Sequence, residues 1–141
     1  MTIKEQQDTI IEEFSFFTDW TEKYEYIIQL GKDLPLIDEQ YKKEENLIRG
    51  CQSKVWLHAE HKEGKIYFTA DSDAVITKGL VSMVVRVLSG QSPNDIAGAA
   101  IYFVDAIGLK NHLSLTRSNG LLSMLKQMKM YGVAFRNLEM R

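Results

Sequence analysis

The spacing of hydrophobic residues predicts two helices at the start of the chain. Between residues 3 and 17 the apolar side chains fall roughly on one helical face. Asp19 and Glu22 have the spacing of a capping box, which predicts the start of a second helix that ends at Gly31. The charged stretch 32–46 contains a proline and should therefore be a connector with little regular structure.

An alternation of apolar and polar residues in the middle of the chain predicts a β-hairpin. After a short extended piece at 47–48, residues 54–61 alternate, and residues 65–70 return as a second strand beyond a turn at 61–64. The residues expected to face the core from both strands are apolar: Val55, Leu57, Ala59, Ile66, Phe68 and Ala70. A sheet of two strands is stable only when it packs against other elements, so helices should cover it.

Helices return after the hairpin. The motif Asp71-Ser72-Asp73 is a strong start signal for a helix through residues 75–88. Ser92 and Pro93 predict the start of another helix, with proline in its first turn, and residues 101–107 form a further short one.

The last helix is expected to be capped by Thr116 or Ser118 and to carry an apolar face as far as Phe135. The order of helices, a small antiparallel sheet and more helices defines an α+β fold, with helices covering one face of the sheet. The chain has 141 residues and no repeat, low-complexity segment or linker, so residues 1–141 should form a single domain.

Composition removes several classes of function. Hydrophobic residues make up 45% of the chain and charged residues 26%, as in soluble globular proteins. The formal net charge is −2 and the basic residues are scattered, so nucleic acid is not an expected partner. The N-terminus is too polar for a signal peptide, and no apolar stretch is long enough to cross a bilayer. One cysteine without an export signal fits a reducing cytoplasm.

Cys51 is the only cysteine, and it lies in a polar, positively charged segment just ahead of the first strand. Free cysteines usually act as small buried hydrophobes, but the residues around this one are not apolar. Gly50 can present its neighbour at a tight turn, and the positive charges of Arg49 and Lys54 favour the thiolate over the thiol. Hydrogen bonds to a sulfur anion can come from the two residues that follow it. We therefore interpret Cys51 as a reactive thiol.

A single sulfur atom limits the chemistry that this thiol can perform. A cysteine hydrolase needs a nearby base, but His58 lies about 20 Å away along a straight strand at about 3.3 Å per residue. Nothing in the sequence brings His61 or His112 closer, and the chain has no metal-ligand spacing around Cys51. Sulfur transfer needs neither a histidine nor a metal, because a thiolate can attack the outer sulfur of a persulfide without a catalytic base.

Three segments of the chain carry a resemblance to a known family. They are 47–56 (Leu-Ile-Arg-Gly-Cys-Gln-Ser-Lys-Val-Trp), 70–80 (Ala-Asp-Ser-Asp-Ala-Val-Ile-Thr-Lys-Gly-Leu) and 113–121 (Leu-Ser-Leu-Thr-Arg-Ser-Asn-Gly-Leu). With them, the chain resembles the SufE family of sulfur acceptors, which includes the CsdE proteins. The resemblance runs in order through nearly the whole chain, and the segment around Cys51 is its most specific part.

The resemblance implies a sulfur carrier in iron–sulfur cluster assembly. A pyridoxal-phosphate cysteine desulfurase of the SufS or CsdA type would hold sulfur as a persulfide, and Cys51 would take it and thereby stimulate the desulfurase. The sulfur would then pass to a SufBCD-like cluster scaffold. The resemblance also implies a fold shared with IscU-type scaffold proteins. Because the chain lacks the three cysteines of those scaffolds, no metal or cluster is expected on it. As a covalent carrier it is expected to need no other cofactor and to have no independent enzyme activity.

The resemblance also suggests roles for the residues around Cys51. Gly50 and Gln52 would shape its loop together with Ser53. Arg49 would support the thiolate or contact the partner, unless it is an ordinary surface arginine. Arg117 would make a tertiary or partner contact, because a cation is not favoured at a helix N-terminus.

The aspartates after the second strand have two readings. Asp71 and Asp73 are expected to cap the helix that follows. Alternatively, Asp71 and Ser72 lie beside the cysteine loop and regulate its exposure. A persulfide in water is open to stray thiols and oxidants, so we expect Cys51 to be sheltered in the free protein and to swing out on docking.

Other functions stay open at this stage. Cys51 could relay sulfur to another thio-cofactor or to a tRNA thiolation pathway. It could also serve a thiol-dependent enzyme that pairs it with a histidine, or be incidental to a structural domain.

Overall fold

The computed structural model describes residues 1–140, and it opens with the two expected helices, α1 (Ile3–Phe14) and α2 (Trp20–Gly31). Asp19 caps α2, because its side chain accepts a hydrogen bond from the Glu22 N–H at 2.8 Å. α1 ends three residues before the end of its apolar pattern. Phe17 lies beyond the helix, where its ring packs edge-on against Phe14. It is therefore apolar because of a contact made from the loop, not because it belongs to the helix face.

The hairpin forms as the alternation predicts, from strands β1 (Val55–Lys62) and β2 (Lys65–Ser72). The strands pair antiparallel from Val55 opposite Ser72 to Lys62 opposite Lys65. Both residues of the turn, Glu63 and Gly64, have positive φ, which matches the twist of a two-residue hairpin loop. β2 is two residues longer than the pattern suggests, so Asp71 and Ser72 belong to the strand.

The outer edge of β2 is closed by short segments from elsewhere in the chain. The N–H groups of Ile66, Phe68 and Ala70 donate to the Gln91 carbonyl, the Ser89 hydroxyl and the Pro35 carbonyl, at 2.9 to 3.1 Å. The connector 32–46 is therefore more ordered than expected. It also contains two short 3₁₀ turns, η1 (Glu39–Tyr41) and η2 (Glu44–Asn46).

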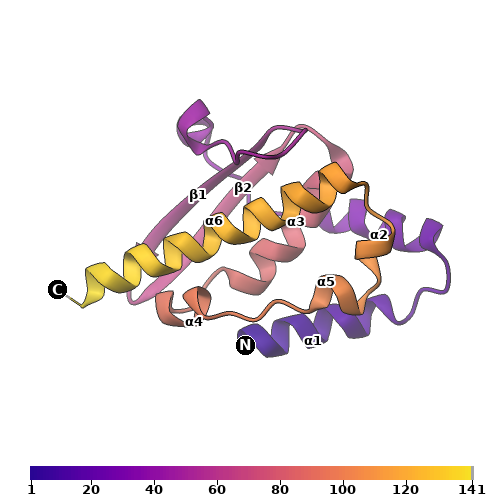
Figure 1. The fold of residues 1–141 in the computed structure, drawn as a ribbon, viewed down its shortest axis with the longest axis horizontal. Coiled ribbons are helices and arrows are strands. Elements are labelled where there is room, and N and C mark those ends of the chain that lie inside the picture. Colours follow the sequence, from indigo (N-terminus) through magenta and orange to yellow (C-terminus); the bar gives the residue numbers. More distant parts are fainter. Residues whose placement is uncertain (141) are drawn as a thin grey trace.

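The central helix is α3 (Val75–Leu88), which contacts α1 and α2 on one side and β2 and α6 on the other (Figure 1). Its cap is Ala74, without a side-chain hydrogen bond, so the expectation that Asp71 and Asp73 cap this helix is wrong. Both carboxylates make tertiary contacts instead. Gly79 lets α3 approach α2 closely, since a Cβ there would lie 2.1 Å from the Ile27 carbonyl oxygen.

The rest of the chain is α4 (Pro93–Ala97), α5 (Phe103–Ala106), the 3₁₀ turn η3 (Leu109–Asn111) and the long helix α6 (Leu115–Glu139). Ser92 caps α4, as predicted. The cap of α6 is Ser114, whose hydroxyl accepts from the Arg117 N–H at 3.2 Å, and not Thr116 or Ser118. The helix begins earlier than expected because the first hydroxyl in the serine and threonine run takes the capping position.

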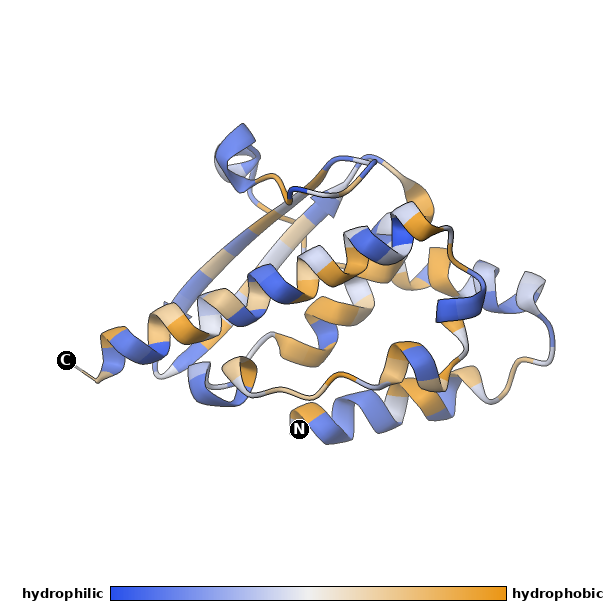
Figure 2. Ribbon diagram, viewed as in Figure 1, coloured by the Kyte–Doolittle hydropathy of each residue, from blue (hydrophilic) through white to orange (hydrophobic). Residues whose placement is uncertain are grey.

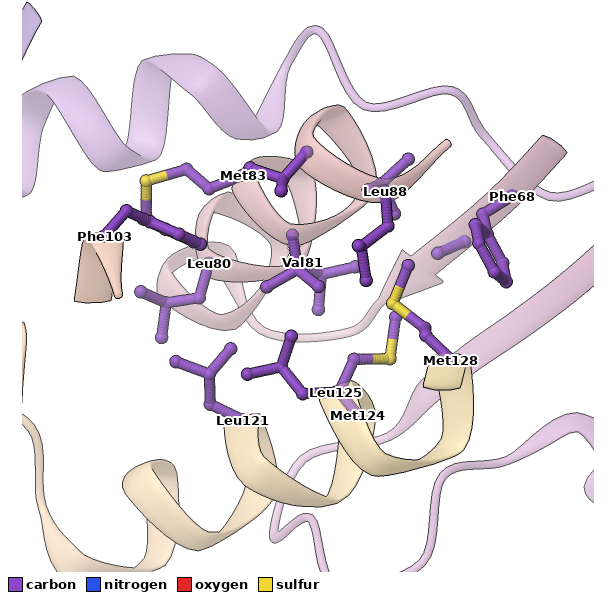
Figure 3. Packing of buried hydrophobic residues seen from close by; sticks show 14 of the residues in the cluster. Phe68, Leu80, Val81, Met83, Leu88, Phe103, Leu121, Met124, Leu125 and Met128 are labelled. Carbon is purple, nitrogen blue, oxygen red and sulfur yellow. The ribbon is translucent and has the colours of Figure 1, made fainter. Parts of the chain in front are cut away.

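The core lies between α3, α6 and the inner face of the hairpin, which confirms an α+β fold. Figure 3 shows Leu80 and Val81 of α3 pointing toward Leu121 and Leu125 of α6, with Leu88 on the side of Met128 and the hairpin. The other side chains labelled there are at most 3% exposed: Phe68, Met83, Phe103, Met124 and Met128. Within residues 1–140, no helix combines the length and apolar character needed to cross a membrane.

Candidate functional site

Cys51 lies in a loop, Arg49–Ser53, that joins an extended piece to β1. The ends of the loop are held together, because the Ile48 N–H donates to the Val55 carbonyl at 2.8 Å. Gly50 has a φ of 91°, and a Cβ at that position would lie 2.8 Å from the Ser123 hydroxyl of α6. The backbone conformation therefore favours glycine at position 50, and a larger residue would also have to displace the Ser123 hydroxyl.

Asp73 anchors the far end of the cysteine loop. Its carboxylate accepts a hydrogen bond from the Lys54 N–H at 3.0 Å, and its own N–H donates to the Lys54 carbonyl at 3.2 Å. These two bonds tie the loop to the end of β2. The position of Asp73 is thus explained by a contact with the cysteine loop and not by helix capping.

The thiol of Cys51 packs directly against the backbone of α6 at Gly120. A Cβ on Gly120 would lie 3.1 Å from Cys51 Sγ and 3.5 Å from Cys51 Cα. The thiol donates a weak hydrogen bond to the Gly120 carbonyl, with 3.6 Å between sulfur and oxygen. A glycine inside a helix costs about 0.5–1 kcal/mol relative to alanine, and here it makes room for the thiol.

A cavity of about 80 Å³ opens beside the thiol, between the loop, α3 and α6. Its apolar wall comes from the strand and the two helices: Val55, Leu80, Val81, Leu121 and Met124. Its polar lining comes from the loop and the helix starts: Gln52, Ser53, Thr77, Thr116 and Arg117. One water molecule needs only about 10–15 Å³ of such space, so a second sulfur about 2 Å beyond Sγ has room.

Burial raises the pKa of the Cys51 thiol above its ordinary value. The expectation that nearby positive charge favours the thiolate is therefore wrong for this conformation. Arg49 is exposed and lines a separate hollow, between η2 and α6, and Lys54 is exposed as well. Their charges stay in water, where they stabilise a partly buried sulfur very little, and desolvation of the thiolate dominates.

Of the other predicted residues, Arg117 reaches the cavity and Asp71 does not. Arg117 lies in the exposed first turn of α6. Asp71 pairs with Lys42 at 3.0 Å and Lys78 at 3.5 Å, on the outer side of β2. Partial burial opposes its ionisation, but hydrogen bonds from Lys42 and the Ser72 N–H, with the charge of Lys78, hold the pKa of Asp71 below its usual value.

Ser72 is buried at the start of the turn into α3. Its hydroxyl accepts a hydrogen bond from the Ala74 N–H at 3.3 Å. It lies opposite Val55, the first residue of β1 after the cysteine loop, but it does not line the cavity. Ser72 therefore shapes the turn that carries Asp73 to the loop.

The histidines lie away from the thiol. His112 stacks on Trp20 and His58 on Tyr41, each with 3.7 Å between ring centres, and His61 pairs with Glu139 near the end of α6. None of them lines the cavity at Cys51. Among residues 1–140, no group of three histidine, cysteine, aspartate or glutamate side chains is arranged to hold a metal ion.

Several site residues were not recognisable in the sequence as such. Thr77, Leu80 and Val81 belong to α3, and Met124 belongs to the apolar face of α6, so their local signal is that of an ordinary helix packed on a core. Gly120 did offer a signal, because a glycine inside a helix often has a packing reason.

A protein-family model described as "SufE: Fe-S metabolism associated domain" matches residues 8–132 of the chain. The chain is also similar to two uncharacterised SufE-like proteins. It is 40% identical over 127 residues to one from Rhizobium meliloti, covering 86% of this chain and 91% of that protein. It is 42% identical over 128 residues to one from Rhizobium etli, covering 86% of each.

Among solved structures, the fold is similar to the solution structure of a hypothetical protein from Thermus thermophilus. The TM-score is 0.76, and the match covers 92% of this chain and 94% of that one. At 18% sequence identity, this similarity concerns the fold alone.

Proposed function

This chain belongs to the SufE family, whose domain is associated with Fe-S metabolism, and from that premise we propose that Cys51 is a sulfur carrier. It accepts sulfur from the persulfide of a pyridoxal-phosphate cysteine desulfurase. By clearing that persulfide it stimulates the desulfurase, and it then delivers the sulfur to an iron–sulfur cluster scaffold. In this proposal the protein is a covalent carrier and an activator, without a catalytic cycle of its own.

The transfer balances without an oxidant or a reductant. The Cys51 thiol loses its proton to solvent, and the thiolate attacks the outer sulfur of the desulfurase persulfide. A new S–S bond forms on Cys51, the S–S bond on the desulfurase breaks, and the desulfurase thiolate leaves and takes up a proton. Delivery to the scaffold repeats the same exchange with a scaffold thiolate as the attacking group.

The observation that supports this proposal best is the cavity beside Cys51 Sγ. It has room for one more sulfur atom, and Leu80, Val81 and Met124 line it away from bulk water. A persulfide held there is shielded from stray thiols and oxidants. Close packing around a purely structural thiol would be expected to leave little such space next to the sulfur.

The proposal includes a movement of the cysteine loop when the partner docks. The thiol is partly buried against Gly120, and burial raises its pKa, so this conformation disfavours both the thiolate and the approach of a large reactant. Docking has to lift residues 49–53 away from α6, which exposes the sulfur and lowers the cost of forming the thiolate. The desulfurase thus meets a reactive thiol only after binding.

Mass spectrometry of the intact protein tests the proposal. After incubation with a cysteine desulfurase from the same organism and with free cysteine, the chain should gain the mass of one or more sulfur atoms. Reductant should remove this mass, and Cys51→Ser should not acquire it. If the chain gains no mass while the desulfurase turns over, the carrier proposal fails.

A thiol enzyme that pairs Cys51 with a histidine is not favoured by the geometry. His58, His61 and His112 each contact aromatic rings away from the cavity. Relay to a cluster scaffold, as opposed to a thio-cofactor or a tRNA, is supported by the family's association with Fe-S metabolism. Incubation of the persulfide form with apo-scaffold, followed by the appearance of cluster absorbance, tests that step.

A further inference from the structure

A second surface, on the side of α6 that faces away from Cys51, has the character of a binding groove. Two hollows of about 210 and 470 Å³ lie between α6 and the segment that joins α4 to η3, and they share the residues Ile101, Leu122 and Leu125. Figure 2 shows hydrophobic residues along both α6 and that segment. We name this surface the α6 groove.

The floor of the α6 groove is apolar and open to solvent. Eight apolar residues form it: Ile101, Val104, Leu113, Leu121, Leu122, Leu125, Met130 and Val133. Leu122 is 64% exposed, Met130 is 55% exposed and Val133 is 38% exposed, although all three lie on the helix that also builds the core. A continuous exposed apolar patch of this kind is a usual mark of an interaction surface.

The rim of the groove is positively charged, in a chain whose net charge is −2. Lys110, Lys126 and Lys129 line the two hollows, against a single acidic residue, Asp105. None of the three lysines forms an ion pair within residues 1–140, whereas Lys4, Lys42 and Lys78 elsewhere do. The rim therefore leaves cationic groups free for an acidic partner.

The groove is formed before any partner arrives. A Cβ on Gly132 would lie 2.8 Å from the Ala97 N atom, so α6 is held against α4 by backbone contact. Phe103 is 1% exposed and fixes the following segment in the core. A partner therefore gains its contact area without ordering the groove, which lowers the cost of binding.

The dimensions of the groove suit a helix. Along α6 it extends from Ser118 to Val133, which at 1.5 Å per residue is about 22 Å. Its lining residues on α6 recur every three or four positions, at 118, 122, 125, 129 and 133, and such rows accept the ridges of a second helix. An extended peptide would gain little from this spacing, because its side chains alternate every two residues.

We propose that the α6 groove binds an amphipathic helix with acidic flanks from a partner protein. The apolar face of that helix covers Leu122, Met130 and Val133, and its carboxylates pair with the lysines of the rim. Gly120, which contacts Cys51, is about 200° around α6 from Leu122, so a helix centred on Leu122 does not cover Gly120, although Leu121 lines both the groove and the cysteine cavity. A partner can thus hold the protein through this groove while another molecule reacts at Cys51.

A peptide-display library tests the chemistry of the partner directly. Each member is a helical peptide of about 15 residues, which matches the groove length, with a fixed apolar face and randomised flanking positions. Selection uses the full chain, with Leu122→Glu as the negative selection. The proposal expects the enriched peptides to carry Asp and Glu at the flanks, and their affinity to fall at least about tenfold in Leu122→Glu.

A charge swap and a matched surface control make the test specific. The double variant Lys126→Glu/Lys129→Glu should reject the acidic peptides and bind the same sequences with lysine at the flanks. Phe16→Glu changes a 75% exposed apolar residue just after α1, outside the groove, and should bind like the wild type. If Leu122→Glu fails to fold by circular dichroism, Met130→Glu takes its place.

Three results would overturn the proposal. The first is no enrichment above the Leu122→Glu background, and the second is enrichment of basic or neutral flanks. The third is sedimentation showing that the wild type self-associates through this face and Leu122→Glu does not, which would assign the groove to a second copy of the chain. None of these readouts involves sulfur transfer, so a failure of the groove proposal can be distinguished from a failure of the carrier proposal.

Discussion

The thiol of Cys51 is partly buried by its nearest neighbours. It packs on the Gly120 backbone and faces an apolar wall, and this burial raises the pKa of Cys51. A carrier with a permanently exposed thiolate would react with any disulfide or oxidant in the cell. If Cys51 carries sulfur as proposed, this local structure would lower the reactivity of the free thiol and protect it before a partner docks.

The pH dependence of alkylation measures this effect on Cys51. The rate of reaction with iodoacetamide should rise with pH in the folded protein, with its midpoint above that of the same chain unfolded in urea. The sign follows from the raised pKa, since the folded state resists deprotonation in the range where the unfolded thiol already ionises. A folded-state midpoint at or below the unfolded value would contradict this account of the site.

At the scale of elements, the cysteine loop is tied at both ends and lies on α6 in between. The Ile48–Val55 hydrogen bond closes its base, and Asp73 holds Lys54 at the end of β2. The middle of the loop contacts α6 through Gly50 and Cys51 without a large side chain between the backbones. Such a loop can lift as a unit while its two ends stay in place.

Removal of the Asp73 anchor should raise the accessibility of Cys51. Asp73→Ala deletes the acceptor of the Lys54 N–H, and one hydrogen bond contributes about 0.5–1.5 kcal/mol, so alkylation at fixed pH should speed up about two- to tenfold. Asp73→Asn keeps an acceptor oxygen and serves as the matched control. Equal alkylation rates in the wild type and Asp73→Ala would mean that the anchor does not limit opening.

The sequence predicts an element correctly where its signal is local. The prediction fails where a tertiary contact determines what a residue does. The two-residue period of 54–70 and the caps at Asp19 and Ser92 are confirmed. Asp73 looks like a helix cap in sequence, but its carboxylate is drawn to Lys54, nineteen positions earlier. No local pattern records such a partner.

The residues of the candidate site also fall into a group that the sequence predicts and a group that it does not. Gln52 and Ser53 follow the thiol in the chain and do line its cavity, together with Arg117. Arg49 is equally close in sequence but lines the hollow between η2 and α6. The chain turns at Gly50, so the residues before and after it line different hollows. The walls from α3 and α6 depend on helix packing, which apolar periodicity predicts only as a buried face.

At the scale of the whole molecule, one ion pair links α1 to the central helix. Arg86 of α3 donates to the Glu13 carboxylate through both terminal nitrogens, and the Tyr26 hydroxyl donates to the same group. The hydrogen bond from Arg86 holds the pKa of Glu13 below its ordinary value, against the effect of partial burial. This pair joins the N-terminal helix to the helix whose other side faces α6 and the hairpin.

The stability of the fold should therefore depend on Glu13 in acid. Because its folded-state pKa is lowered, its contribution is present above the unfolded value of 4.5 and is lost as the pH falls through the folded value. Glu13→Gln should lower the free energy of unfolding at pH 7 by about 1 kcal/mol, a small figure because the pair is partly exposed.

Urea denaturation at a series of pH values measures this contribution. The difference between wild type and Glu13→Gln should shrink below about pH 4. Glu12→Gln, an exposed neighbour on α1, should behave like the wild type at every pH. A difference between wild type and Glu13→Gln that stays constant into acid would rule out the ion pair as its cause.

The closed outer edge of β2 has a consequence for how this protein meets other chains. Ile66, Phe68 and Ala70 use their outward N–H groups within the chain, and the Ser72 N–H bonds the Asp71 carboxylate. A foreign strand thus finds these outward N–H groups of β2 already bonded, which disfavours strand addition along that edge. Strand addition by another chain is therefore left to the outer edge of β1, where Trp56 bridges Leu47 near the start of the strand.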